Sequence, residues 1–247
     1  MTRRRPNGLT ALPVAVLLLT GCADQGAERA AEAPRRPLDV SVLRISKADY
    51  DPALSPEALA GQEPVVVAGV VDGWQRGPAL ESYEDGPLDH RVVLRIRATD
   101  VLKGTVPGGV VFVELDQGAV VRDDSLPAEK WKPAKSVADF ATAIPAGTKA
   151  MAFLAERPPH EQRVLDAGEP LPARAHLMGA PPQGLVFEDP FLAARQPDRP
   201  ALVGGKEPLD AAGRTPWLEP RNMTELIDRL KDKGFSGQPF GGRAAVP

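Results

Sequence analysis

Hydrophobic and polar residues alternate most regularly in the stretch DHRVVLRIRATDVLKG, residues 89–104. One face carries Val92, Leu94, Ile96 and Ala98, and the other carries Arg91, Arg95, Arg97 and Thr99. Successive side chains of a strand point to opposite faces, so this period of two is typical of a half-exposed β-strand. Only Val93 interrupts the polar face. The pattern predicts a strand with one face against a core.

Shorter apolar runs, each bounded by turn residues, predict further strands. They are PVVVAGVVDG (64–73), VVFVEL (110–115), TKAMAFLAER (148–157), GLVFED (184–189) and ALVGG (201–205). The stretch SVLRIS (41–46) is also compatible with a short strand. The chain is therefore expected to be mainly β.

Two stretches show the helical period instead. Their apolar stripes are Val137, Phe140, Ala141 and Ile144 in the first, and Met223, Leu226, Ile227 and Leu230 in the second. Ser136 and Asp139 resemble a capping box before the first stripe, and Pro145 ends it. Asn222 is placed to cap the second, and Gly234 to end it. The patterns predict an inserted helix at 137–144 and a C-terminal helix at 223–233.

Irregular segments are expected to be long, because 27 prolines and 23 glycines make up about a fifth of the chain. Residues 158–183, rich in Pro, Ala and Gly, are interpreted as a surface loop. A short helical turn is expected at 55–61, where a serine precedes a proline and a glycine closes the turn.

Five or six short strands, with one helix between the third and fourth, are the element order of a small OB-type β-barrel. The order from Pro64 to Glu156 resembles the netrin/tissue-inhibitor-of-metalloprotease OB-like module of secreted proteins. The shared features are an apolar strand ending in Gly, a strand ending in Leu-Lys-Gly, a third strand, and a Gly followed by an apolar strand. The resemblance implies a five- to six-stranded OB-like barrel. It does not imply protease inhibition, because the animal members' disulfides and inhibitory N-terminal cysteine are absent. An immunoglobulin-like sandwich is the alternative fold.

The N-terminus has the order of a secretory signal peptide. Arg3, Arg4 and Arg5 precede an apolar run from Leu9 to Leu19. A helix of that length is too short to cross the ~30 Å hydrocarbon core of a membrane. The sequence therefore predicts export, with residues 1–21 as the signal peptide.

Leu19-Thr20-Gly21-Cys22 resembles the lipobox of bacterial lipoproteins. The resemblance implies cleavage between Gly21 and Cys22 and a diacylglycerol on the Cys22 thiol, which anchors the protein stably because it carries two acyl chains. Residues 22–37 then form a flexible tether, and residues 38–247 a single domain on the outer face of the cell membrane. The alternatives are a soluble signal peptide with an incidental cysteine and, less well matched, a twin-arginine export signal.

The net charge and composition of the chain limit the classes of partner that it is expected to bind. Residues 1–21 hold three arginines and no acidic residue, so their removal changes the formal charge from −3 to −6. That balance disfavours nucleic acid, which requires a basic patch. Cys22 is the only cysteine, so no internal disulfide forms. The abundance of Ala, Arg, Pro and Gly is typical of high-GC genomes, such as those of actinobacteria.

No catalytic or metal-binding motif is evident. His90, His160 and His176 are far apart and lack the spacing of a zinc site. No serine lies in a G-x-S-x-G or S-x-x-K motif, and with Cys22 acylated no cysteine nucleophile remains. No catalytic residue, metal ligand or cofactor is therefore predicted.

Trp74, Trp131 and Trp217 are expected in loops or at strand ends. Aromatic side chains in such places are frequent anchors of binding surfaces, and they equally serve as core at the ends of a barrel. Both roles stay open for the three tryptophans.

Three functions remain. The first is a lipid-anchored binding or scaffold protein for an envelope protein or polymer. The second is a hydrolase or metal-dependent enzyme whose site residues are dispersed along the chain. The third is a lipoprotein that binds a small ligand at the mouth of the barrel.

Overall fold

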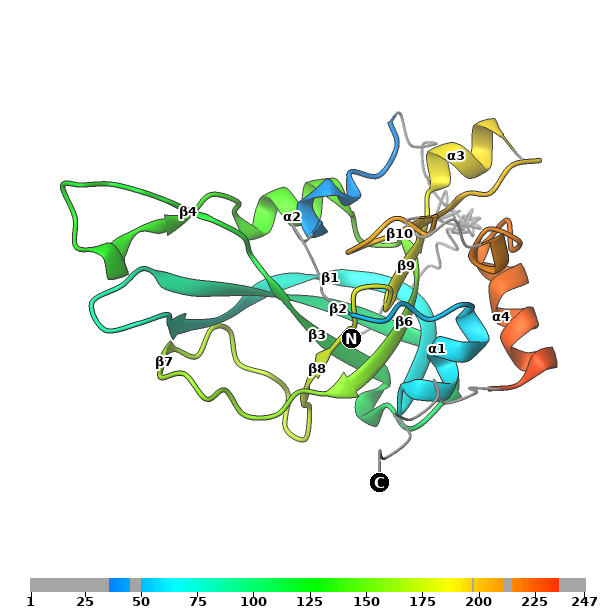
Figure 1. The fold of residues 1–247 in the computed structure, drawn as a ribbon, viewed down its shortest axis with the longest axis horizontal. Helices are drawn as coiled ribbons and strands as arrows, with labels where there is room; N and C mark the ends of the chain where they lie inside the picture. The colour runs from blue at the N-terminus through cyan, green and yellow to red at the C-terminus, as the bar shows by residue number, and fades with distance from the viewer. Residues whose placement is uncertain (1–35, 45–49, 197, 211–214, 236–247) are drawn as a thin grey trace, which may run out of the picture. The chain divides into compact units, whose positions relative to one another are not determined.

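The computed structural model of the chain (Figure 1) describes residues 36–44, 50–196, 198–210 and 215–235. The chain divides into two units, residues 1–32 and 33–247, and all described residues belong to the second. The predicted signal peptide, Cys22 and all but the last two residues of the predicted tether lie outside the described ranges. No helix within those ranges is both long and apolar enough to cross a membrane.

The described fold is mainly β, and eight of its strands form one sheet. They are β1 (Val65–Glu81), β2 (Leu88–Lys103), β3 (Val110–Asp116), β6 (Lys149–Glu156), β7 (Val164–Asp166), β8 (Leu177–Gly179), β9 (Leu185–Glu188) and β10 (Leu202–Gly204). Their order is β10-β9-β6-β8-β3-β2-β1-β7, with a further pairing between β6 and β1. A separate two-stranded ribbon is formed by β4 (Val120–Val121) and β5 (Lys132–Pro133).

The strand pairings return to their starting point. β1 pairs antiparallel with β2, and β2 pairs antiparallel with β3. β3 then pairs in parallel with β8, β8 pairs antiparallel with β6, and β6 pairs antiparallel with β1. Strands β1, β2, β3, β8 and β6 are thus linked in a cycle. β9 is added along the first half of β6, and β10 pairs with the outer edge of β9.

Four α-helices accompany the sheet in the described residues. They are α1 (Pro56–Gln62), α2 (Val137–Ala143), α3 (Pro190–Arg195) and α4 (Met223–Lys233). Each begins at a side chain that accepts a backbone N–H of its first turn; these caps are Ser55, Ser136, Asp189 and Asn222. Short 3₁₀ helices are η1 (Val40–Leu43), η2 (Pro107–Gly109), η3 (Ala128–Lys130) and η4 (Thr215–Trp217).

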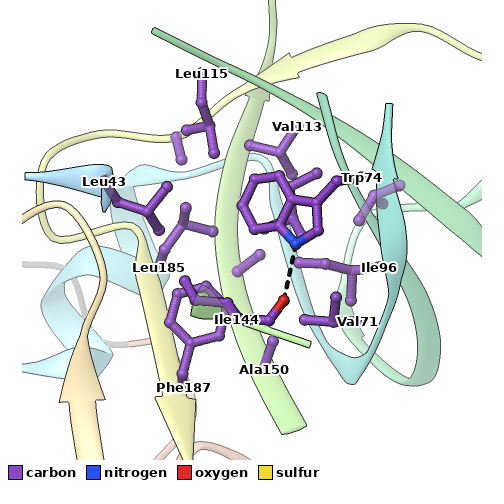
Figure 2. Close-up of a cluster of buried hydrophobic side chains, with 14 of the residues drawn as sticks. Leu43, Val71, Trp74, Ile96, Val113, Leu115, Ile144, Ala150, Leu185 and Phe187 are labelled. Carbon is purple, nitrogen blue, oxygen red and sulfur yellow. Dashed lines mark hydrogen bonds between the residues drawn. The ribbon is translucent and has the colours of Figure 1, made fainter. Parts of the chain in front are cut away.

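The first hydrophobic cluster lies on the face of the sheet that carries Trp74, Ile96, Val113 and Phe187 (Figure 2). The Trp74 indole N–H donates to the Ile144 carbonyl at 2.9 Å. The rings of Trp74 and fully buried Phe140 lie 5.3 Å apart between centroids, which ties α2 to this cluster.

A second cluster lies on the opposite face of β1, β6 and β9. Alternation along β6 places Ala152 in the first cluster and Phe153 in the second. The second cluster is completed by α1 and α4, which lie side by side on the right of Figure 1. Trp217 packs edge-on against Phe153, with ring centroids 6.0 Å apart. β6, β9 and the first part of β1 are therefore buried on both faces.

The segment before η1 is fixed to the domain at two consecutive backbone groups. The Leu38 N–H donates to Asp189 Oδ2 at 3.0 Å. The Asp39 N–H donates to the Ala143 carbonyl at 3.2 Å. The chain is thus held at α2 and at the start of α3 just before η1 begins.

The predicted strands at 110–115, 148–157, 184–189 and 201–205 are confirmed, and α2 and α4 occupy the predicted helical stretches. The expected five or six strands are too few. The strand considered for 41–46 is wrong over its described residues, 41–44, because the Asp39 carboxylate accepts the Ser41 N–H at 3.1 Å and starts η1 instead; residues 45 and 46 lie outside the described ranges. Residues 158–183 are not wholly loop, because they contain β7 and β8.

An ion pair joins the two helices that cover the second cluster. Arg229 of α4 donates to both carboxylate oxygens of Glu57 of α1, at 3.2 Å for Nη2 to Oε2. The Glu57 side chain is only 6% exposed. Burial raises the pKa of Glu57, but hydrogen bonds, chiefly from Arg229, outweigh it and leave the pKa below its usual 4.5.

We expect Glu57→Gln to lower the free energy of unfolding by about 3 kcal/mol at pH 7, because Arg229 then lacks its buried counter-charge. A carboxyl with a lowered folded-state pKa stabilises above its unfolded pKa, and this contribution is lost as the pH falls through the folded value. The difference in the free energy of unfolding between the wild type and Glu57→Gln should therefore become smaller as the pH falls from 5 to 3. Urea unfolding at each pH measures this difference. Glu129→Gln, at an exposed position of η3, is the control. A deficit that stays constant with pH would contradict the assignment.

Candidate functional site

The structure does not gather the three tryptophans into one surface. Trp74 is 8% exposed and Trp217 is 2% exposed, so both are core side chains of different clusters. The Trp217 indole N–H donates to the Ala53 carbonyl at 3.0 Å. Trp131 is half-buried beside the β4–β5 ribbon, where its indole N–H donates to the Asp123 carbonyl at 2.9 Å.

The three histidines are likewise dispersed. His90 Nε2 lies 3.3 Å from the Trp131 carbonyl, and His176 Nδ1 lies 3.0 Å from Glu156 Oε1. His160 Nε2 lies 3.0 Å from Glu114 Oε2. Within the described ranges, no three His, Cys, Asp or Glu side chains are grouped so that they could hold a metal ion.

A cavity of about 610 Å³ opens beside the C-terminal half of β3. β8 pairs with β3 only at Phe112 and Val113, so the edge of β3 from Glu114 onward is not covered by β8. η1, the segment after β3, and the residues that follow β6, β8 and β10 surround this edge. The lining residues are Val42, Leu43, Arg44, Arg91, Glu114, Leu115, Asp116, Gly118, Ala119, Lys135, Arg157, Ala180 and Lys206.

The cavity is strongly cationic, although the whole chain has a formal charge of −3. Five of its lining side chains are basic and two are acidic, a formal excess of three positive charges. The basic residues are Arg44, Arg91, Lys135, Arg157 and Lys206.

Glu114 is the more enclosed of the two acids, with a side chain 0% exposed. Alternation along β3 directs it away from Val113 and Leu115, which belong to the first cluster. Arg157 Nε lies 2.8 Å from Glu114 Oε1, and His160 contacts the other oxygen. The Nε–H of Arg157 does not point at Oε1, which accepts no hydrogen bond from the described residues. Glu114 is thus occupied by its own ion pairs.

The two lysines are positioned by backbone carbonyls rather than by carboxylates. Lys206 Nζ donates to the Ala180 carbonyl at 2.6 Å, and Lys135 Nζ donates to the Val42 carbonyl at 3.0 Å. Burial lowers the pKa of Lys206, and the positive charge of Arg157 lowers it further, against the opposing effect of Asp116 and Glu207. The ammonium of Lys206 is therefore held in place without a full counter-charge.

The arginines also retain unused hydrogen-bond donors. Arg44 Nη1 is buried and has no acceptor in the described part of the chain, and the same is true of Arg91 Nε. Burial lowers the pKa of Arg44. The negative charges of Glu207 and Asp210 raise this pKa, but they do not cancel the effect of burial. Arg44 Nη1 and Arg91 Nε are shielded from the cavity, so they do not themselves offer a donor to a ligand. The guanidinium and ammonium groups that line the cavity are nevertheless the groups that bind carboxylate and phosphate oxygens, so the cavity is suited to an anion.

Sequence reasoning missed this site. The alternating pattern places Arg91 on the polar face of a strand. No sequence motif or pattern distinguishes the other four basic residues, which are Arg44, Lys135, Arg157 and Lys206. These residues come from separate segments, and only the strand pairings bring them to one edge of the sheet. No short sequence motif can describe a cluster whose residues lie far apart along the chain.

Comparisons of the chain with protein-family models, with curated proteins and with solved structures find no match. The geometry and charge of the cavity are therefore the basis for proposing a function.

We expect Glu114→Gln to lower the free energy of unfolding by about 2 kcal/mol, because Arg157 and His160 lose the charge they enclose. The figure is reduced from that of a fully buried pair, since the Arg157 side chain is 33% exposed. Thermal and urea unfolding of the full-length protein measure the change. Glu161→Gln makes the same substitution at an exposed position of the neighbouring segment, and an equal effect at both sites would refute a structural role for the pair.

Proposed function

We propose that this chain is a lipid-anchored extracytoplasmic protein whose β-domain binds a small anion in the cationic cavity beside β3. The observation that carries the proposal is the excess of basic over acidic side chains in the lining of the cavity, five against two. Membrane attachment is proposed from the resemblance of Leu19–Cys22 to a lipobox.

The acids beside the cavity offset its positive charge only in part. Arg91 is paired with Asp89, Glu114 faces Arg157 and His160, and the 58% exposed Asp116 side chain lies 4.0 Å from Arg91. Burial nevertheless leaves the pKa values of Arg44 and Lys206 lowered, despite the favourable charge of Glu207 on both. A bound anion would compensate these two groups further, and perturbed groups that gather in a pocket are characteristic of binding sites.

We further propose that β1, β2, β3, β8 and β6 form an OB-type barrel. The cycle of pairings, the parallel contact between β3 and β8, and the position of α2 between β3 and β6 support this topology. An immunoglobulin-like sandwich, in contrast, consists of two separate antiparallel sheets. On this proposal the cavity lies where the barrel opens at one end of β3.

Binding is favoured over hydrolysis by the chemistry of the cavity wall. Its lining residues include no serine, threonine, cysteine or histidine, so the cavity wall offers no hydroxyl or thiol nucleophile and no imidazole base. A scaffold role toward an envelope protein or polymer remains compatible with a lipid anchor, but no described surface favours it as clearly as the cavity favours a small anion.

We expect Lys206→Met to weaken the binding of citrate, used as a probe anion, at least tenfold without lowering the stability of the protein. The substitution removes one positive charge, together with the cost of burying it. Isothermal titration calorimetry at low ionic strength measures the affinity, and urea unfolding measures the stability. Lys132→Met, at an exposed position of β5, is the matched control. Unchanged citrate binding in the Lys206→Met variant would show that citrate does not bind in the cavity.

The anchor is tested separately. We expect the wild-type protein, expressed in a bacterium that matures lipoproteins, to fractionate with the membrane and its Cys22 peptide to carry the mass of the lipid. Cys22→Ala removes the thiol, and we expect this variant to leave the membrane fraction. Thr20→Ser keeps a small residue near the cleavage site and should remain with the membrane. An unmodified Cys22 in the wild-type protein would rule out the anchor.

A further inference from the structure

We infer that a second cavity, at the opposite end of β3 from the cationic cavity, binds a small carboxylate that has an apolar body, and that Arg174 holds its carboxylate group. The inference does not rest on the anion binding proposed above, because the two cavities share no lining residue. Its basis is the apolar wall of the second cavity, the guanidinium group of Arg174, and the backbone conformation of that residue.

The apolar cavity, as we name this second cavity, has a volume of about 350 Å³ and opens beside the start of β3. Its apolar lining includes Val65, Val106, Val110, Val111 and Met178. Val65, Val106 and Met178 pack against the first hydrophobic cluster but are only partly buried. Small-molecule sites typically have volumes of roughly 300–1,000 Å³ and are lined mostly by apolar side chains. The wall therefore offers the body of a ligand an apolar surface that is continuous with the core.

Three side chains that can carry a charge line the same cavity. His176 Nδ1 lies 3.0 Å from Glu156 Oε1, so these two side chains are occupied with each other at an exposed rim. Arg174, in contrast, forms no ion pair, side-chain hydrogen bond or ring contact with the described residues. Its guanidinium is therefore the group of this cavity that stays open to a ligand.

The backbone of Arg174 lies in the left-handed region, with a φ of 69°. Arg174 is the third residue of a turn in which the Ala175 N–H donates to the Pro172 carbonyl at 3.0 Å. Glycine or asparagine is usual at a positive φ in such a turn, because other side chains crowd their own backbone there. Within the described ranges the other non-glycine residue with a positive φ is Asp85, and aspartate tolerates this conformation better than arginine does.

The arginine at position 174 is thus explained neither by the preference of the turn nor by a contact with the described residues. Side chains that are held at a conformational cost gather at functional sites, and this one lines a cavity. A guanidinium binds a carboxylate in a planar, two-pronged geometry. We therefore assign Arg174 to the recognition of an oxyanion.

The charges of the apolar cavity favour a ligand with a single negative charge. Glu156 offsets the charge of Arg174 in the formal count of the lining and would repel a second oxyanion group. A phosphate monoester, which carries close to two negative charges at neutral pH, fits this lining less well than a carboxylate does. The expected ligand class is therefore a monocarboxylate with an aromatic or branched hydrocarbon body.

The test compares three small molecules by isothermal titration calorimetry of the full-length protein in a neutral detergent at low ionic strength, with titrations into the detergent alone as blanks. 3-Phenylpropanoate has both expected features, propanoate lacks the apolar ring, and 3-phenylpropanamide lacks the charge. We expect 3-phenylpropanoate to bind at least tenfold more tightly than either of the others. A smaller preference over either one, or no measurable binding of 3-phenylpropanoate, would overturn the inference.

Lys206→Met separates this inference from the proposed function. We expect this variant to bind 3-phenylpropanoate as tightly as the wild type does, because Lys206 lines the cationic cavity and not the apolar one. A loss of 3-phenylpropanoate binding in Lys206→Met would place this ligand in the cationic cavity. That result would overturn the inference while it supports the proposed function.

Arg174→Gly tests the arginine itself. We expect it to weaken 3-phenylpropanoate binding at least tenfold without lowering the midpoint of urea unfolding, because glycine adopts a positive φ without strain. Asp85→Gly is the matched control, since Asp85 has a φ of 58° in a turn that the Gly86 N–H closes by donating to the Tyr83 carbonyl at 2.9 Å. An unchanged affinity in Arg174→Gly, or an equal loss in Asp85→Gly, would show that Arg174 does not hold the carboxylate.

Discussion

The burial of β6, β9 and the first part of β1 on both faces is the constraint on which the rest of this fold depends. A strand with two covered faces needs apolar side chains at successive positions, as in Val66 and Val67 of β1 or Ala152 and Phe153 of β6. One set of these side chains requires α2 and the opposite strands, and the other requires α1 and α4. Both clusters must therefore form together around the same backbone. The ion pair between Glu57 and Arg229 then fixes the two outer helices to each other.

The sequence predicts those elements whose stability is mostly local. The capping box of α2 and the Asn222 cap of α4 are complete within a few residues, and the alternation in β2 is readable over its whole length. β8 is different. It has only three residues, Leu177–Gly179, and its pairing depends on β3 and β6, so nothing in its own composition distinguishes it from the surrounding loop.

The cavity was beyond sequence reasoning for a related reason. Its cations are spread from Arg44 to Lys206, and each one alone resembles an ordinary surface charge. They become a site only because β8 leaves the end of β3 uncovered and the flanking segments converge there. The tryptophans, which attract attention in the sequence, are used differently: Trp74 and Trp217 donate their indole N–H groups to carbonyls inside the two clusters.

The two backbone hydrogen bonds at Leu38 and Asp39 have a mechanical consequence. They attach the chain to Asp189 and to the end of α2 immediately before η1, and η1 supplies Val42, Leu43 and Arg44 to the cavity wall. A load applied to the chain from the N-terminal side would therefore act on these two hydrogen bonds before it acts on Arg44, so the domain bears the load ahead of the cavity wall.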